Sequence, residues 1–400
     1  MKKSIILLVI FIAAQTINGQ SRYDAMLSSI ALSARGDNEE AVSMLTREIV
    51  QGATAGLYIL RGDIYFKEGR TKEATSDFMA AENLSQGSGL YGLAECAAVK
   101  SDAKAATAYL ESHLKSDFKK SEPEILLDNA FERVASSPEW KALWKKEWYK
   151  GYERMQWEIT HFISIGRIDL ADDVYVSLAA DYPGMPVTEY CDALLEIARG
   201  QYRAAIDHLS PLTETQGASA AYLTAMASAQ AGNGNYYASA TIYSKLIGAE
   251  YPDPKLYLHR AEMLFKAGDS KGSIADLKKY LGYFPDDFEA LSLVGKAYAN
   301  EGSIYDALPY LNLNIEKHPG EAQSFSLRGD AWFASHSWDK AAEDYTMSLD
   351  LDPNSAAVNL NLGIALINCG KAQDACHYLK KARDLGEKGA TTYLSKYCIR

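Results

Sequence analysis

The chain has 400 residues, and its 41 Lys and Arg against 52 Asp and Glu give a formal net charge of −11 at pH 7. This acidic balance argues against nucleic acid as the main partner, because binding to phosphates needs positive charge. Beyond the first residues no stretch is long and apolar enough to cross a membrane, so we predict no transmembrane segment.

The chain opens with a pattern typical of a secretory signal peptide. Lys2 and Lys3 form a positive start, and residues 5–14 form an apolar run that is too short to span a bilayer stably. We expect cleavage after Gly19, which assigns residues 1–19 to the signal peptide. The alternative is an uncleaved membrane anchor. No cysteine precedes Cys96, so we do not expect a lipoprotein.

Residues 20–115 contain small and large apolar residues in an order that returns later in the chain. The clearest copy runs through Gly62, Tyr65, Gly69, Ala74, Phe78 and Ala81, and weaker copies lie before and after it. The same segment contains the tripeptide Arg61-Gly62-Asp63, which animal cell-surface receptors can read on an exposed loop. An adhesive function is therefore one interpretation of this segment.

Residues 116–150 leave this order and form a helical insert rich in Trp and Lys. Trp140, Trp144 and Trp148 recur every four residues, which predicts a stripe along one helix. We interpret the stripe as packing between the helical arrays on either side of it. The alternatives are a membrane-surface helix and an aromatic patch that binds sugar or a partner.

From residue 151 to residue 386 the order returns with a fixed period. Prolines, glycines and alanines each recur at intervals of 34 residues, at Pro285, Pro319 and Pro353, at Gly295, Gly329 and Gly363, and at Ala307, Ala341 and Ala375. A fixed period of this size indicates a solenoid.

Each period contains the pattern of two helices. Trp332 and Phe333 lie on one helical face, a polar turn follows, and Ala341 begins a second face that continues with Tyr345. Small residues at Gly329 and Ala341 let the two helices approach closely. Neither helix can bury its apolar stripe alone, so each pair must stack on the next one.

This pattern resembles the tetratricopeptide repeat, whose signature is W-x2-L-G-x2-Y, then A-x3-F, then P. The resemblance covers about four fifths of the chain. It implies an all-α fold, namely an α-solenoid with a right-handed superhelix of about nine helix-turn-helix units. It assigns an N-terminal array to residues 20–115 and a C-terminal array to residues 151–386. Both Arg-Gly-Asp tripeptides, at 61–63 and 328–330, then lie in mid-helix, so we interpret their repetition as architectural.

The resemblance also implies a concave groove that is built from the first helix of each unit. We predict that the groove of the C-terminal array is lined by Leu258, Glu262, Phe265, Lys266, Lys296, Asn300, Asp330, Phe333 and Ile364. This mixture of apolar and charged side chains suits an extended peptide or a partner helix.

The chain contains five cysteines. Cys96 and Cys191 stand alone in alanine-rich frames, where we expect buried free thiols. The ending around Cys376 and Cys398 resembles the terminus of many repeat proteins from Bacteroidetes-type bacteria. That resemblance implies a Cys376–Cys398 disulfide, which would tie a capping helix within residues 387–400 to the last unit. No cysteine or histidine pair has the spacing of a metal site, so we expect none.

No catalytic signature is found in the sequence, and we predict neither an enzyme nor a cofactor. The hypothesis is a non-enzymatic interaction scaffold or adaptor of a bacterial cell envelope, in the periplasm or at the cell surface. It would bind a protein or peptide partner in the groove. The alternative is a carbohydrate-binding or cell-wall-binding module that uses the Trp-rich insert.

Overall fold

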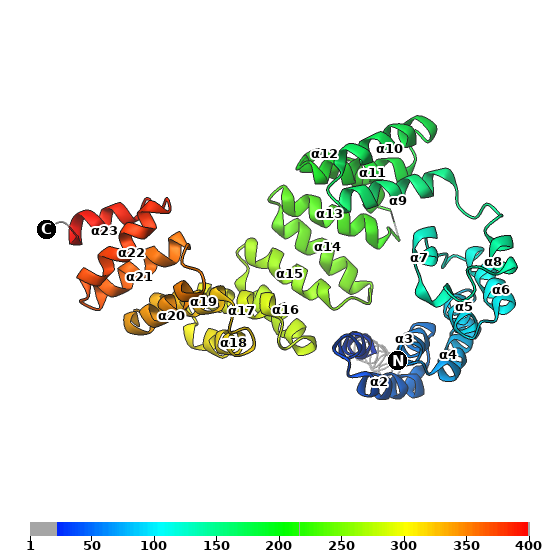
Figure 1. Ribbon diagram of the computed structural model, residues 1–400, viewed down its shortest axis with the longest axis horizontal. Coiled ribbons are helices and arrows are strands. Elements are labelled where there is room, and N and C mark those ends of the chain that lie inside the picture. Colours follow the sequence, from blue (N-terminus) through cyan, green and yellow to red (C-terminus); the bar gives the residue numbers. More distant parts are fainter. Residues whose placement is uncertain (1–21, 216, 399–400) are drawn as a thin grey trace, which may run out of the picture. The chain divides into compact units, whose positions relative to one another are not determined.

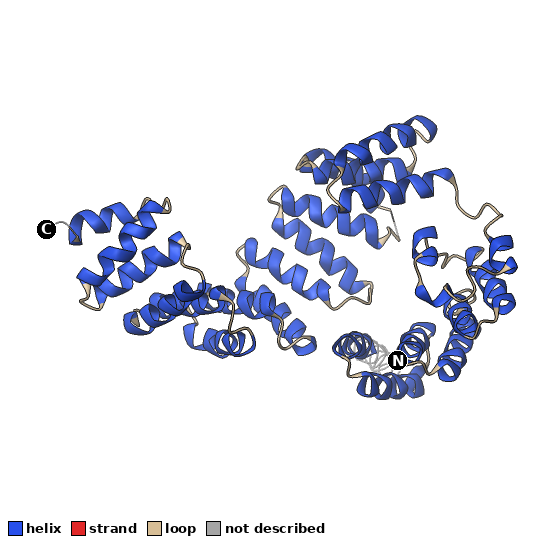
Figure 2. Ribbon diagram, in the orientation of Figure 1, coloured by secondary structure: helices blue, strands red, loops and turns tan. Residues whose placement is uncertain are grey.

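The computed structural model describes residues 22–215 and 217–398, and the predicted signal peptide lies outside them. Within these residues every regular element is a helix and none is a strand (Figure 2). Helix follows helix along the chain with short turns between them (Figure 1). The predicted all-α class is confirmed.

The residues up to Asn233, together with Leu246–Pro254, form one compact unit. Its first helix includes residues 22–35. The helices that follow before the insert are α2 (Asn38–Gly52), α3 (Ala55–Lys67), α4 (Thr71–Leu84), α5 (Leu90–Val99) and α6 (Ala103–Leu114). The insert contains α7 (Glu122–Leu126), η1 (Asn129–Phe131) and α8 (Pro138–Leu143). After it come α9 (Gly151–Ser164), α10 (Ile168–Asp181), α11 (Pro186–Ala198), α12 (Tyr202–Thr213) and α13 (Ala220–Gly232).

Gly234–Lys245 and the residues from Lys255 onward form a second compact unit, so that α14 (Tyr236–Gly248) spans the boundary. The first helices of this unit are α15 (Lys255–Lys266), α16 (Ser270–Tyr283), α17 (Phe288–Asn300) and α18 (Ile304–Lys317). They are followed by α19 (Ala322–Ala334), α20 (Trp338–Leu351), α21 (Ala356–Asn368), α22 (Ala372–Asp384) and α23 (Ala390–Tyr397).

Consecutive helices pack in pairs within each unit. The first unit pairs α3 with α4, α5 with α6, α9 with α10 and α11 with α12, and the second pairs α15 with α16, α17 with α18, α19 with α20 and α21 with α22. Each pair also packs on the next, for example α4 on α5 and α18 on α19. This succession is that of an α-solenoid, so the predicted fold class is confirmed.

A column of small residues lies where the two helices of a pair approach each other. Its members have no exposed surface, and they are Ala41, Ala74, Ala106, Ala171, Ala205, Ser239, Ser273, Ala307, Ala341 and Ala375. Gly329 faces this crossing from the first helix, because a Cβ there would lie 2.8 Å from the ring of Tyr345. The predicted need for small side chains at this crossing is met throughout the described repeats.

The turn between the paired helices needs a residue with positive φ. Glycine provides it at intervals of 34 residues, at Gly166, Gly200, Gly234, Gly268, Gly302 and Gly370. The missing member of this series is His336, which adopts φ 57° itself. A left-handed residue without strain requires glycine, which explains why the period is visible in the turns as well as in the helices.

The insert differs from the predicted single tryptophan-bearing helix. Helix α8 ends at Leu143, Trp144 follows it as the C-cap, and Trp148 lies outside any helix. The prediction of one helical stripe was wrong, because spacing by four residues indicates a face only if the helix continues. The chain turns instead, and the Trp148 indole N–H donates to the Leu143 carbonyl over 2.9 Å.

Aromatic rings nevertheless make the insert a hydrophobic core. Ring contacts run from Phe131 to Trp140 (5.2 Å between centroids), on to Trp144 (5.8 Å), to Tyr149 (6.5 Å) and to Trp157 of α9 (5.0 Å). The same core includes residues of α5 and α6. Within the first unit, the insert therefore joins the last pair before it to the first helix after it.

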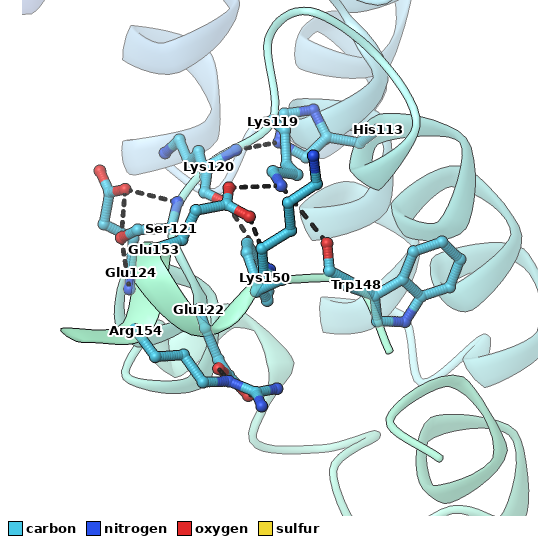
Figure 3. A network of polar contacts seen from close by, with 11 residues as sticks. His113, Lys119, Lys120, Ser121, Glu122, Glu124, Trp148, Lys150, Glu153 and Arg154 are labelled. Carbon is cyan, nitrogen blue, oxygen red and sulfur yellow. Dashed lines mark hydrogen bonds and ion pairs between the residues drawn. The ribbon is translucent and has the colours of Figure 1, made fainter. Parts of the chain in front are cut away.

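Polar contacts hold the two ends of the insert together (Figure 3). The Lys119 ammonium lies 2.7 Å from a Glu153 oxygen and also donates to the Trp148 carbonyl. Arg154 pairs with Glu122 at 2.7 Å. Since Glu153 and Arg154 belong to the first turn of α9, these pairs anchor the start of the second run of repeats.

Candidate functional site

The first-helix surface of the second unit contains a cavity of about 420 Å³. Its walls come from α15 and α17, and Gln323 at the start of α19 closes one side. Three predicted groove residues, Leu258, Glu262 and Lys296, line it together. Successive repeats thus bring apolar and charged side chains from separate helices to one hollow.

Three more of the predicted groove residues lie near the ends of the same helices. The Lys266 ammonium lies 2.7 Å from a Glu262 oxygen, one turn away on α15. Phe265 is half-buried beside them, and Asn300 is exposed at the end of α17. None of these three lines the cavity.

The last three predicted groove residues lie on α19 and α21 and do not line the cavity either. Asp330 accepts hydrogen bonds from the Tyr345 hydroxyl (2.7 Å) and the Asn361 amide (3.3 Å). Phe333 meets Trp338 edge to face at 5.0 Å. Ile364 is half-buried on α21. Asp330 and Phe333 are therefore used in packing between helices.

Six residues line the cavity that were not among the predicted groove residues, namely His259, Phe288, Glu289, Ser292, Leu293 and Gln323. Glu289, Ser292 and Gln323 occupy the same repeat positions as the predicted ones, so the period alone could have identified them. Phe288, His259 and Leu293 stand at other positions of the repeat. Ser292 also accepts from the Asn314 amide at 2.9 Å, which fixes its orientation.

An unpredicted set of ion pairs explains the two Arg-Gly-Asp tripeptides. Arg61, Arg260 and Arg328 each donate two hydrogen bonds of 2.6–2.8 Å to an aspartate 16 residues later, namely Asp77, Asp276 and Asp344. Each arginine also donates to the preceding second helix, at Thr46, Ser244 and Asn312 respectively. The tripeptide arginines therefore tie three helices together.

The three predicted tryptophans do not form an exposed patch. Trp140 is buried, with 7% of its surface exposed, and Trp144 and Trp148 pack partly buried against the same core. A sugar ring stacks on a free aromatic face, and these faces are occupied by neighbouring rings. The glycan-binding alternative therefore gains no support from their placement.

A cavity of about 730 Å³ lies beside the insert, between α7 and α9. Leu126, Leu127, Trp157 and Phe162 make it mainly apolar, and the two leucines are 52% and 80% exposed. Its side chains select no particular ligand, and it has no counterpart in the repeats. We therefore place the candidate site in the cavity between α15 and α17.

The cysteines have two different states. Cys376 of α22 and Cys398 are joined by a disulfide, as the resemblance implies, while Cys96 and Cys191 are buried free thiols. Cys369 is also a free thiol. Over the described residues, no group of three His, Cys, Asp or Glu side chains is placed to hold a metal ion, and no helix has the length and apolar character to span a membrane.

Comparison with known proteins identifies one repeat directly. Residues 55–87 match the family model described as Tetratricopeptide repeat. The segment covers α3 and α4, which is the clearest N-terminal copy in the sequence.

Two curated proteins are similar over part of the chain. The BBSome complex member bbs-4 of Caenorhabditis elegans is 25% identical over 130 residues, which are 32% of this chain and 28% of that protein. The Protein CTR9 homolog of Arabidopsis thaliana is 29% identical over 102 residues, which are 26% of this chain and 9% of that protein. The chain thus spans less than a third of the length of either relative.

Solved structures of similar chains are shorter than this one. MamA 41-end from Desulfovibrio magneticus RS-1 is 20% identical with a TM-score of 0.38, over 41% of this chain and 92% of that chain. YrrB, described as a TPR protein with an unusual peptide-binding site, is 16% identical with a TM-score of 0.39, over 47% and 97%. At these TM-scores the likeness assigns no function.

Proposed function

We propose that the protein is a non-enzymatic scaffold that binds a partner polypeptide in the cavity between α15 and α17. The carrying observation is the lining, in which Leu258, Phe288 and Leu293 offer apolar surface while Glu262, Glu289 and Lys296 offer both charges. A hollow of about 420 Å³ accommodates one or two side chains of a bound peptide. The solenoid supplies the extended surface for the rest of the peptide.

The proposal includes export to a bacterial envelope. Its support is the signal-peptide pattern of residues 1–19 and the Cys376–Cys398 disulfide, since disulfides persist in oxidising compartments. The measurement is fractionation of cells that express the full chain with a C-terminal tag. Recovery of tagged protein in the cytoplasm alone would contradict the export part and leave the binding site untested by that result.

The binding test is differential capture of partners from the envelope fraction of the source organism. Leu258→Asp places a charge on the apolar wall, and Lys296→Glu inverts the charge on the opposite helix. We expect either change to reduce recovery of a specific partner at least about 10-fold, because a desolvated charge mismatch costs several kcal/mol.

Lys278→Glu is the matched control, because Lys278 is exposed on the second helix α16 and does not line the cavity. Circular dichroism shows whether each variant keeps its helices. Phe333→Ala is a poor test because Phe333 packs against Trp338. Equal recovery of all partners by the wild type and the three variants would show that this cavity is not the binding site.

A further inference from the structure

A separate cavity of about 490 Å³ lies on the first-helix surface of the N-terminal array, where α3 meets α5. Four aromatic residues line it, namely Phe66, Phe78, Tyr91 and Phe118. Phe78 reaches the cavity because Gly62 and Gly92 leave space for its ring; a Cβ at Gly92 would lie 2.5 Å from it. Aromatic faces around a hollow attract cations through their quadrupoles.

Two carboxylates, Asp63 of α3 and Glu95 of α5, line the same cavity. Burial raises the pKa of Asp63 to about 6. Burial, and then the charges of Asp128 and Asp63, raise the pKa of Glu95 to about 8. The ionised forms of both groups are thus poorly compensated in the protein, and an additional positive charge in the cavity would stabilise them.

The chain itself shows which cation this cavity accepts. The Lys120 ammonium, from the loop after α6, lies 3.8 Å from the centroid of the Tyr91 ring. Lys120 also lines the cavity. An alkylammonium group therefore fits against these ring faces.

A buried histidine adds a second requirement. His113 lines the cavity and is only 2% exposed. Burial lowers the pKa of His113 to about 4, so the ring is neutral at pH 7. Its Nε2 accepts from the Lys120 backbone N–H at 3.0 Å, which places the ring proton on Nδ1. That Nδ1 is buried without a hydrogen-bond partner among the described residues, so it can donate to a carbonyl of a ligand.

We propose that this cavity binds a lysine side chain of a partner polypeptide. Asp63 and Glu95 provide the negative charge, and the aromatic rings surround the alkylammonium group. The His113 donor selects a ligand that carries a peptide carbonyl as well as an ammonium group. The site is independent of the cavity between α15 and α17, so the failure of one proposal leaves the other standing.

The test uses the full chain and two probes at low salt. The first probe is lysine blocked as Nα-acetyl-lysine N-methylamide, with the norleucine analogue as its uncharged match. The second probe is putrescine, a free diamine without a carbonyl. Ligand-observed NMR titration measures the dissociation constant of each.

We expect saturable binding of the lysine probe and none of the norleucine analogue. Glu95→Gln and Asp63→Asn should each weaken binding at least about 10-fold, since each removes one counter-charge. Lys120→Met should strengthen binding several-fold, because it removes the ammonium that occupies the Tyr91 face. Glu132→Gln, at an exposed carboxylate of the insert, should leave binding unchanged.

Changing the pH provides a further readout. The groups around Glu95 are Asp63 and Lys67 on α3, Asp128 before η1, His113 on α6 and Lys120. Affinity should rise between pH 6 and pH 9 as the Asp63 and Glu95 carboxyls ionise. It should fall again near the pKa of the probe amine, at about 10.4.

Binding of both probes with equal affinity would support an ammonium site that serves free amines, and preference for the blocked lysine would support a polypeptide. The proposal is overturned by the absence of saturable binding. It is equally overturned if Glu95→Gln matches Glu132→Gln, or if Lys120→Met loses binding while circular dichroism shows intact helices.

Discussion

At the scale of single residues, Gly329 shows how a missing side chain sets the distance between two helices. A Cβ added there would lie 2.8 Å from the Tyr345 ring, which is fully buried and held by its hydrogen bond to Asp330. The ring has no free space into which it can move. Gly329 is therefore required by contact, although glycine is a poor helix former.

The two effects predict opposite outcomes at two helical glycines. Gly329→Ala should destabilise the protein by about 1–3 kcal/mol, because overpacking outweighs the gain in helix propensity. Gly282→Ala on α16, where no atom lies within 4 Å, should stabilise it by about 0.5–1 kcal/mol. Urea denaturation of both variants measures the difference. A stabilising Gly329→Ala would refute the close approach of α19 and α20.

His208 of α12 carries a pH dependence. Its Nδ1 lies 2.6 Å from a Glu189 oxygen, and Asp192 and Glu196 lie 3.7 and 3.8 Å from its Nε2. The hydrogen bond to Glu189 and then the nearby carboxylates raise the pKa of His208. The folded protein therefore holds this proton to higher pH than the unfolded chain, whose histidine pKa is about 6.5.

The stabilising contribution of His208 should be complete below about pH 6.5 and should be lost as the pH rises through the folded-state pKa. His208→Gln should thus destabilise the protein more at pH 5.5 than at pH 9. The difference should stay below about 1 kcal/mol, because the ring is 34% exposed and its pairs are screened by water. Denaturation at both pH values, with the exposed His377→Gln as control, measures it. The same loss at both pH values would exclude an ionic role.

At the scale of elements, the disulfide determines how firmly the last helix is attached. Helix α23 has eight residues and packs on α22, and the Cys376–Cys398 bond closes a loop with a sequence separation of 22 residues. A helix this short is marginal by itself. The bond stabilises the attachment mainly by restricting the unfolded chain, to the extent of about 3 kcal/mol for a loop of this length.

Reduction of the disulfide, or Cys398→Ser, should release α23 without unfolding the remaining repeats. Amide hydrogen exchange should accelerate in Ala390–Tyr397 and change little before α21. Cys369→Ser is the control, because Cys369 is a free thiol near the same end of the chain. Unchanged exchange in α23 after reduction would show that packing alone holds the helix.

The insert shows why an element cannot always be inferred from spacing. Trp140, Trp144 and Trp148 have helical spacing, but the helix ends after six residues at Leu143. The rings reach one core because the chain turns and Tyr149 and Trp157 complete the stack. Burial of the rings, and not a continued helix, is what their spacing serves here.

At the scale of the whole molecule, stability should be a sum of local contributions. Each described helix pair contacts mainly its neighbours in the chain, which is the behaviour of a quasi-one-dimensional array. Gly329→Ala should accordingly accelerate amide exchange in α18 to α21 and leave α3 to α6 at the wild-type rate. Hydrogen exchange with mass spectrometry resolves both regions. An equal acceleration in all helices would indicate one cooperative fold.

The amino-acid sequence by itself determined the repeat, its period and the helical class. Small residues at the helix crossing and glycines in the turns recur every 34 residues, since each unit has the same local geometry to satisfy. These features depend on neighbours within one unit. They can therefore be read without coordinates.

Only the tertiary structure decided which surface residues are available. Asp330 and Phe333 occupy groove positions but contact Tyr345 and Trp338, whereas Leu258, Glu262 and Lys296 line a cavity. The Arg–Asp pairs and the cavity with Asp63 and Glu95 also join side chains from several helices. Such contacts depend on side-chain packing between units, which a period within the sequence does not specify.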